Sequence, residues 1–173
     1  DACGIASMTV SPTTFDCSDA IPPVTNLFIS EYVEGSGNNK AIELYNPTPT
    51  PINLADGYKL KMYFNGSVTV GLTVNLTGTM ASGATYVVAN SASSAGILAL
   101  ADQTAGGGWY NGDDAIVLED PAGNLLDVFG RIGEDPGAEW SVGGNTTQDN
   151  TLRRLPTVTQ GVTANPAIGF PTL

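Results

Sequence analysis

The 173-residue sequence has no histidine, few positive charges and no long hydrophobic run. Without histidine, neither a Ser-His-Asp or Cys-His catalytic group nor a histidine-ligated metal centre can form. Only three lysines and three arginines stand against 17 acidic residues, and the net charge of −11 disfavours binding to the phosphate backbone of a nucleic acid. Because no run of about 18 apolar residues occurs, we expect no membrane insertion.

The sequence is instead rich in glycine and proline, with 21 and 11 residues, while charged residues make up only 13%. The 42% of hydrophobic residues is too high for a disordered chain. This composition favours an all-β protein with many turns, and its low lysine content is typical of secreted or cell-surface proteins.

Short segments of alternating apolar and polar residues, together with the apolar segment 85–89 that is typical of a buried strand, predict the strands of a β-sandwich. The expected strands cover residues 27–33, 41–45, 58–64, 68–76, 85–89, 115–118, 125–129 and 151–155. Asn65-Gly66 is the strongest hairpin signal and predicts that 58–64 pairs with 68–76. The one expected helix, at 93–100, is short and capped by serine.

Two boundaries divide the chain into an N-terminal extension (1–25), a sandwich (26–155) and a C-terminal tail (156–173). The first follows Pro22-Pro23, and the tail is expected to wrap the surface or to stay loose. Cys3 and Cys17 lie 14 positions apart in the extension, where a disulfide would stabilise the fold by about 3 kcal/mol. The alternative is a pair of free thiols in a reducing compartment.

Several blocks, in order, resemble the bacterial branch of the lamin-tail domain family. They are LFISEYVEGSGNNKAIELYN, ATYVVANSAS, NGDDAIVLED, LLDVFGRIGEDPGAEW and DNTLRR, from residue 27 to residue 154. The resemblance implies an immunoglobulin-like fold of about eight or nine strands and a non-enzymatic module of large secreted bacterial proteins. The first 17 residues resemble the end of an Ig-like or PKD-like repeat of surface proteins.

The densest acidic cluster holds Asp113, Asp114, Glu119 and Asp120. Calcium takes six to eight oxygen ligands, so these carboxylates are the candidate calcium site. The alternative is a structural role, because aspartate in turns commonly accepts hydrogen bonds from its own backbone. A second acidic loop, at residues 134–139, is a weaker candidate.

Glu31 and Glu43 lie mid-strand, where they can face each other across neighbouring strands. Paired carboxylates serve glycosidases. The preferred interpretation is a structural ion pair with Arg153 or Arg154, which lie together in the last strand.

Trp109, Tyr110 and Trp140 fall in glycine-rich loops. Exposed loop aromatics stack on sugars or fill a partner's pocket, whereas the alternative is that they fold onto the edge of the core. They are the candidate partner-binding residues.

The sequence predicts no enzyme and no required cofactor. The first functional hypothesis is a secreted module for adhesion, with protein or glycan partners. The second is a filament or surface-layer subunit, in which residues 5–10 pair with the edge strand of another copy. The third is an accessory domain of a secreted nuclease, against which the net charge argues.

Overall fold

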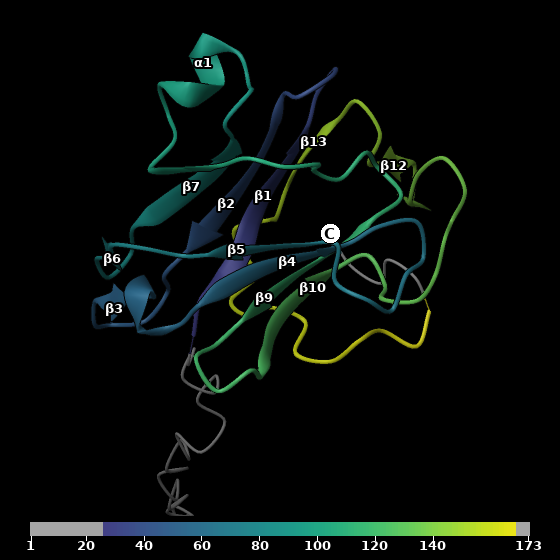
Figure 1. The fold of residues 1–173 in the computed structure, drawn as a ribbon. Coiled ribbons are helices and arrows are strands. Elements are labelled where there is room, and N and C mark those ends of the chain that lie inside the picture. The colour runs from purple at the N-terminus through teal and green to yellow at the C-terminus, as the bar shows by residue number, and fades with distance from the viewer. Residues whose placement is uncertain (1–25, 169–173) are drawn as a thin grey trace, which may run out of the picture.

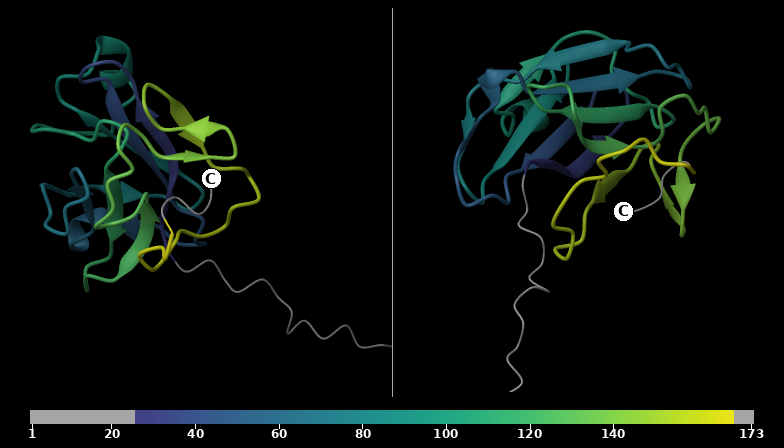
Figure 2. Two further views of the ribbon diagram at one scale, coloured as in Figure 1. Left: turned by 90° about the vertical axis from the view of Figure 1, so that its right-hand side faces the viewer. Right: turned by 90° about the horizontal axis from the view of Figure 1, so that it is seen from below.

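Two β-sheets pack face to face in the computed structural model, which describes residues 26–168 (Figures 1 and 2). The five-stranded sheet has the order β13-β1-β2-β7-β8. Its strands are β1 (Phe28–Glu34), β2 (Lys40–Tyr45), β7 (Thr85–Asn90), β8 (Gln103–Ala105) and β13 (Thr151–Arg153). Only β7 and β8 run parallel to each other within this sheet.

The second sheet is antiparallel and has the order β10-β9-β4-β5. It contains β4 (Lys59–Tyr63), β5 (Leu72–Asn75), β9 (Ala115–Glu119) and β10 (Leu125–Phe129). Among residues 26–168 the two sheets together hold nine strands, which confirms the predicted immunoglobulin-like β-sandwich. Smaller two-stranded pairs join β3 (Ile52–Asn53) to β6 (Thr79–Met80) and β11 (Ser141–Val142) to β12 (Asn145–Thr146).

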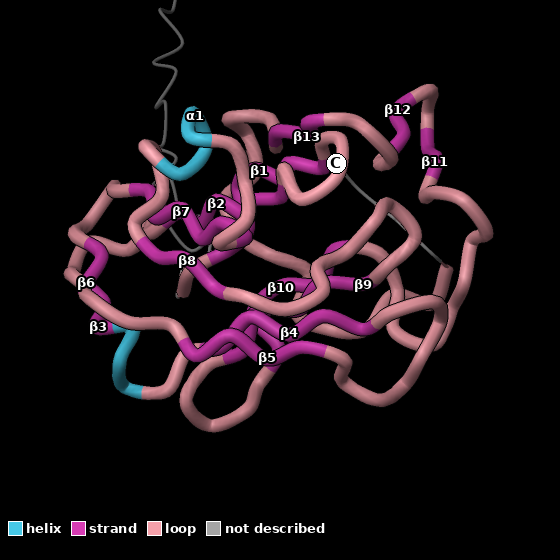
Figure 3. The backbone as a smooth tube through the Cα atoms, turned by 45° about the horizontal axis from the view of Figure 1, so that its top comes forward, coloured by secondary structure: helices cyan, strands magenta, loops and turns pink. Residues whose placement is uncertain are grey.

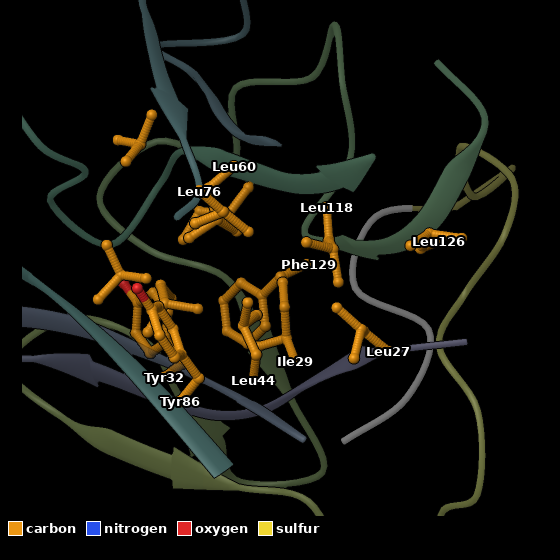
Figure 4. Packing of buried hydrophobic residues seen from close by; sticks show 14 of the residues in the cluster. Leu27, Ile29, Tyr32, Leu44, Leu60, Leu76, Tyr86, Leu118, Leu126 and Phe129 are labelled. Atoms are coloured by element: carbon orange, nitrogen blue, oxygen red, sulfur yellow. The ribbon is translucent and has the colours of Figure 1, made fainter. Parts of the chain in front are cut away.

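The core lies between the facing sheets (Figure 4). Ile29 and Leu44 extend from one sheet toward Leu60 and Leu118 of the other, and all four are at most 2% exposed. Burial of each such side chain contributes roughly 1.5–3 kcal/mol relative to its exposure to water. In β2 and β4 such residues alternate with polar ones, which is the pattern that predicted these strands, whereas residues 115–118 of β9 are apolar throughout.

The β4–β5 connection differs from the expected tight hairpin. Asn65 and Gly66 do form a turn with positive φ angles of 49° and 69°. However, the ring of Phe64 packs directly on the backbone of Gly71, where even a Cβ atom would lie 2.3 Å from it. Residues 64–71 therefore form a folded loop, and strand pairing begins at Met62 with Leu72 instead of at residue 68.

The predicted helix shortens to α1 (Ala95–Leu98), which lies beside one end of the five-stranded sheet (Figure 3). Ser94 occupies the N-cap position, but its side chain makes no capping hydrogen bond. Its backbone N–H instead donates to Asn39 Oδ1 at 2.8 Å, which ties the start of α1 to the β1–β2 turn.

Asp127 of β10 links the two sheets and the C-terminal segment. Its carboxylate is fully buried and accepts hydrogen bonds from the Ile29 N–H, the Val162 N–H and Arg154 Nη2, each at 2.8 Å. Both β1 and β10 shift register beside this contact. The C-terminal segment, residues 154–168, accordingly runs along the sandwich (yellow in Figures 1 and 2).

The N-terminal extension lies outside the described residues. This includes the expected Cys3–Cys17 disulfide and the expected strand at 5–10.

Candidate functional site

Loops distant in sequence surround a hollow of about 290 Å³ at one end of the five-stranded sheet. The β1–β2 turn and the segment that precedes β13 both lie at this end, at the top of Figure 1. The hollow is lined by Glu34, Gly37, Asn38, Lys40, Asn90, Trp109, Tyr110, Asn111, Gln148 and Asp149. We call it the loop-end hollow.

Tyr110 fixes one wall of the loop-end hollow to the sheet. Its buried hydroxyl lies 2.8 Å from the Val33 carbonyl oxygen and 2.7 Å from that of Ala41, so it bridges β1 and β2. Its ring stacks on Tyr32 with centroids 4.8 Å apart, and Tyr32 stacks on Phe129. Burial raises the pKa of Tyr110 well above its ordinary value, so this hydroxyl stays protonated as a donor.

A buried ion pair between Glu34 and Lys40 fixes another wall. Both side chains are less than a tenth exposed. Glu34 also accepts the backbone N–H of Asp149, and Lys40 also donates to the Gly35 carbonyl. The two charges balance each other and hold the β1–β2 turn against the segment before β13.

The three candidate aromatic residues separate into two groups. Tyr110 and Trp140 are buried in the core, and Trp140 Nε1 donates to the Asp114 carbonyl at 3.0 Å. Trp109 is half-buried and lines the hollow. Its indole N–H is inaccessible to solvent and has no hydrogen-bond partner in the described part of the chain.

Asp113 and Asp114 follow Trp109 and Tyr110 in the sequence, and both are buried. Asp114 accepts hydrogen bonds from the Asn65 N–H at 2.8 Å and the Asn111 N–H at 3.1 Å. Burial raises the pKa of Asp114 to about 6, and it also raises the pKa of Asp113. With its nitrogen turned toward them, the side-chain amide of Asn111 donates to both carboxylates.

The other two acids of the candidate calcium site have separate partners. Glu119 pairs with Lys61 at 2.6 Å. Asp120 accepts hydrogen bonds from the Ala122 and Asn124 backbone, and the Asn124 side chain lowers its pKa. Across residues 26–168 no three acidic or cysteine side chains are grouped to hold a metal ion, so the structure does not gather the four acids into one site.

The second acidic loop has a similar arrangement. Glu134 pairs with Arg131 at 2.6 Å, Asp135 accepts the Gly137 N–H, and Glu139 accepts the Gln148 N–H.

The predicted ion pairs form in part. Glu31 and Glu43 are cross-strand partners, and Glu31 binds Arg153 at 2.7 Å on the outer face of the sheet. Glu43 instead accepts a hydrogen bond from Ser30 Oγ at 2.6 Å.

The expectation that Arg154 binds one of these glutamates is wrong. Arg153 and Arg154 lie next to each other in an extended segment, so their side chains point to opposite sides, and Arg154 reaches Asp127. Sequence reasoning missed Asp127. A single acid within the apolar strand LLDVF was the available signal for a buried partner.

Residues 21–133, about two thirds of the chain, match the family model described as Lamin Tail Domain. The chain belongs to the lamin-tail domain family. No curated protein and no solved structure matches it. No helix among residues 26–168 is long and apolar enough to cross a membrane.

The lamin-tail match ends before β13 and before three residues with roles described above. These are Trp140, Gln148 and Arg154. The loop-end hollow thus combines residues of the matched region with residues that follow it.

Proposed function

We propose that this lamin-tail domain is a non-catalytic binding module of a larger secreted or cell-surface protein, and that its ligand occupies the loop-end hollow. One observation carries the proposal: unpaired polar side chains surround a hollow whose walls are fixed. Within residues 26–168, the side chains of Asn38 and Gln148 make no hydrogen bond, although both line the hollow. Tyr110 and the Glu34–Lys40 pair hold the loops that carry them.

Apart from Asp149 at the rim, the carboxylates near the hollow are engaged by other groups of the domain, which supports a binding role over a catalytic one. Glu34 is neutralised by Lys40, and both oxygens of Asp114 accept backbone hydrogen bonds. On the sheet face, Glu31 and Glu43 are likewise engaged by Arg153 and Ser30. A general acid and base must be free to exchange protons with a substrate, and these groups serve the fold instead.

The test is a binding panel of neutral glycans, acidic glycans, basic and acidic peptides, and single-stranded DNA. The purified domain is compared with the double variant N38A/Q148A, which removes two side chains from the hollow. The matched control N145A/Q160A removes an exposed asparagine and an exposed glutamine elsewhere. We expect one class to bind the native domain and the control but not N38A/Q148A.

Binding that survives N38A/Q148A would contradict the proposal, as would no binding by any class. Filaments of the purified protein under negative stain would favour the structural-subunit alternative. Preferential binding of DNA at about 50 mM salt would favour the nuclease-accessory alternative.

A further inference from the structure

We infer that the loop-end hollow binds an uncharged sugar ring of a glycan chain. This inference rests on the proposed function and names its ligand class. The hollow, at about 290 Å³, lies just below the roughly 300–1,000 Å³ typical of small-molecule pockets. It therefore suits one ring-sized group, with the rest of a longer ligand extending into solvent.

Side-chain amides dominate the polar lining. Asn38, Asn111 and Gln148 are exposed at the rim, and Asn90 is only 2% exposed at its base. The Asn90 oxygen accepts the Ala92 N–H at 2.9 Å, which leaves its amide nitrogen as a donor. An amide side chain both donates and accepts, and so does each hydroxyl of a sugar, so neighbouring hydroxyls match this lining.

The charge around the hollow disfavours anionic ligands. Glu34 and Lys40 neutralise each other, whereas Asp149 is exposed at the rim. Asp113 and Asp114, whose carboxylates accept hydrogen bonds from the Asn111 side chain, add further negative charge near the hollow. Because no unpaired positive side chain lines the hollow within the described residues, a phosphate, sulfate or carboxylate group would find no counter-charge there.

Trp109 supplies the apolar surface that a sugar ring also needs. It packs against the core cluster on one side and lines the hollow on the other. One face of a sugar ring carries C–H groups, which pack on an aromatic ring while the hydroxyls at the edge bind amides. Trp109 therefore complements the amides of Asn38, Asn90 and Gln148 in a single pocket.

The experiment titrates the purified domain with uncharged oligosaccharides that end in glucose, galactose, mannose or N-acetylglucosamine. Binding is followed by calorimetry and by tryptophan fluorescence at about 50 and 500 mM NaCl. We expect at least one of these sugars to bind with an affinity that salt leaves unchanged, because no charge pair forms. Q148A should weaken binding at least about tenfold and Q160A should not.

W109F is a second variant that keeps an aromatic ring at the same position. The ligand-induced change in fluorescence should disappear in W109F, which retains Trp140 as a fluorophore.

Each alternative result has a distinct meaning. If an acidic glycan or a peptide binds in a Q148A-sensitive manner and no uncharged sugar does, the sugar inference fails while the proposed function stands. If a sugar binds equally well to the native domain and to Q148A, or if no probe binds at all, both fail.

Discussion

At the residue scale, the indole N–H groups of the two tryptophans affect stability in opposite directions: a hydrogen-bonded one stabilises the fold, and a buried one without a partner destabilises it. The indole N–H of Trp140 is bonded to the Asp114 carbonyl, whereas that of Trp109 is buried without a partner. We expect W140F to lower the free energy of unfolding by about 1–3 kcal/mol, because it leaves that carbonyl unpaired. W109F breaks no hydrogen bond and should cost clearly less, which urea denaturation of both variants will measure. Equal losses would contradict the assignment.

Asp114 should make stability depend on pH. Its pKa is raised by burial to about 6 in the folded protein, against about 4 in the unfolded chain. Folding therefore raises proton affinity, and the stability that this residue contributes is full below pH 4 and is lost as the pH rises to about 6. We expect the free energy of unfolding of the native domain to decline more steeply across this window than that of D114N. Identical slopes would show that Asp114 is not the titrating group.

At the element scale, the segment after β13 is held by one buried charge pair. Arg154 is 10% exposed in its side chain and Asp127 is 0% exposed, whereas Arg153 is 73% exposed and pairs with Glu31 on the surface. R154M should lower the free energy of unfolding by about 3–5 kcal/mol, because it leaves the Asp127 carboxylate buried without its partner. The matched variant R153M should cost much less, because its ion pair with Glu31 is exposed to solvent.

Chemical denaturation of the two arginine variants provides the measurement. A larger loss in R153M than in R154M would contradict the description of Asp127 as the link between the sheets and the C-terminal segment.

Elements with a strong alternating pattern were predictable from sequence, and the connections between them were not. Residues 27–33 and 41–45 alternate clearly, and they lie close to the observed bounds of β1 and β2. The late start of β5 depends on Phe64 packing on Gly71, a contact that no local pattern encodes. The pairs β3–β6 and β11–β12 have only two residues per strand, too few to show a period.

The candidate site shows the same division. Loop composition singled out Trp109 and Tyr110, but the partners that surround them come from other loops. Asn38, Asn90 and Gln148 reach the hollow only because β1 and β7 end, and β13 begins, on the same side of the sheet. The sequence therefore predicted the aromatic residues on one side of the hollow, but not the amide side chains that other loops contribute.

At the scale of the whole molecule, the fold extends beyond the region that matches the lamin-tail family. A chain that stops at residue 133 lacks β13, so β1 becomes an edge strand, and it lacks both Arg154 and Val162 as partners of Asp127. We expect this truncated chain to show no cooperative thermal transition by circular dichroism. A chain that stops at residue 155 keeps Arg154 and should unfold cooperatively at a reduced temperature. Cooperative unfolding of the shorter chain at the native temperature would contradict this view.

The central claim is that the loop-end hollow is the binding surface of the domain. Its most direct test is an amide NMR spectrum of the labelled protein, recorded with and without a ligand found in the binding panel. We predict that the largest shifts affect the backbone amides of Gly37, Asn38 and Gln148 and the indole N–H of Trp109, while the indole N–H of Trp140 changes less. Shifts centred instead on Glu31, Glu43 and Leu100, at the outer face of the five-stranded sheet, would contradict the claim.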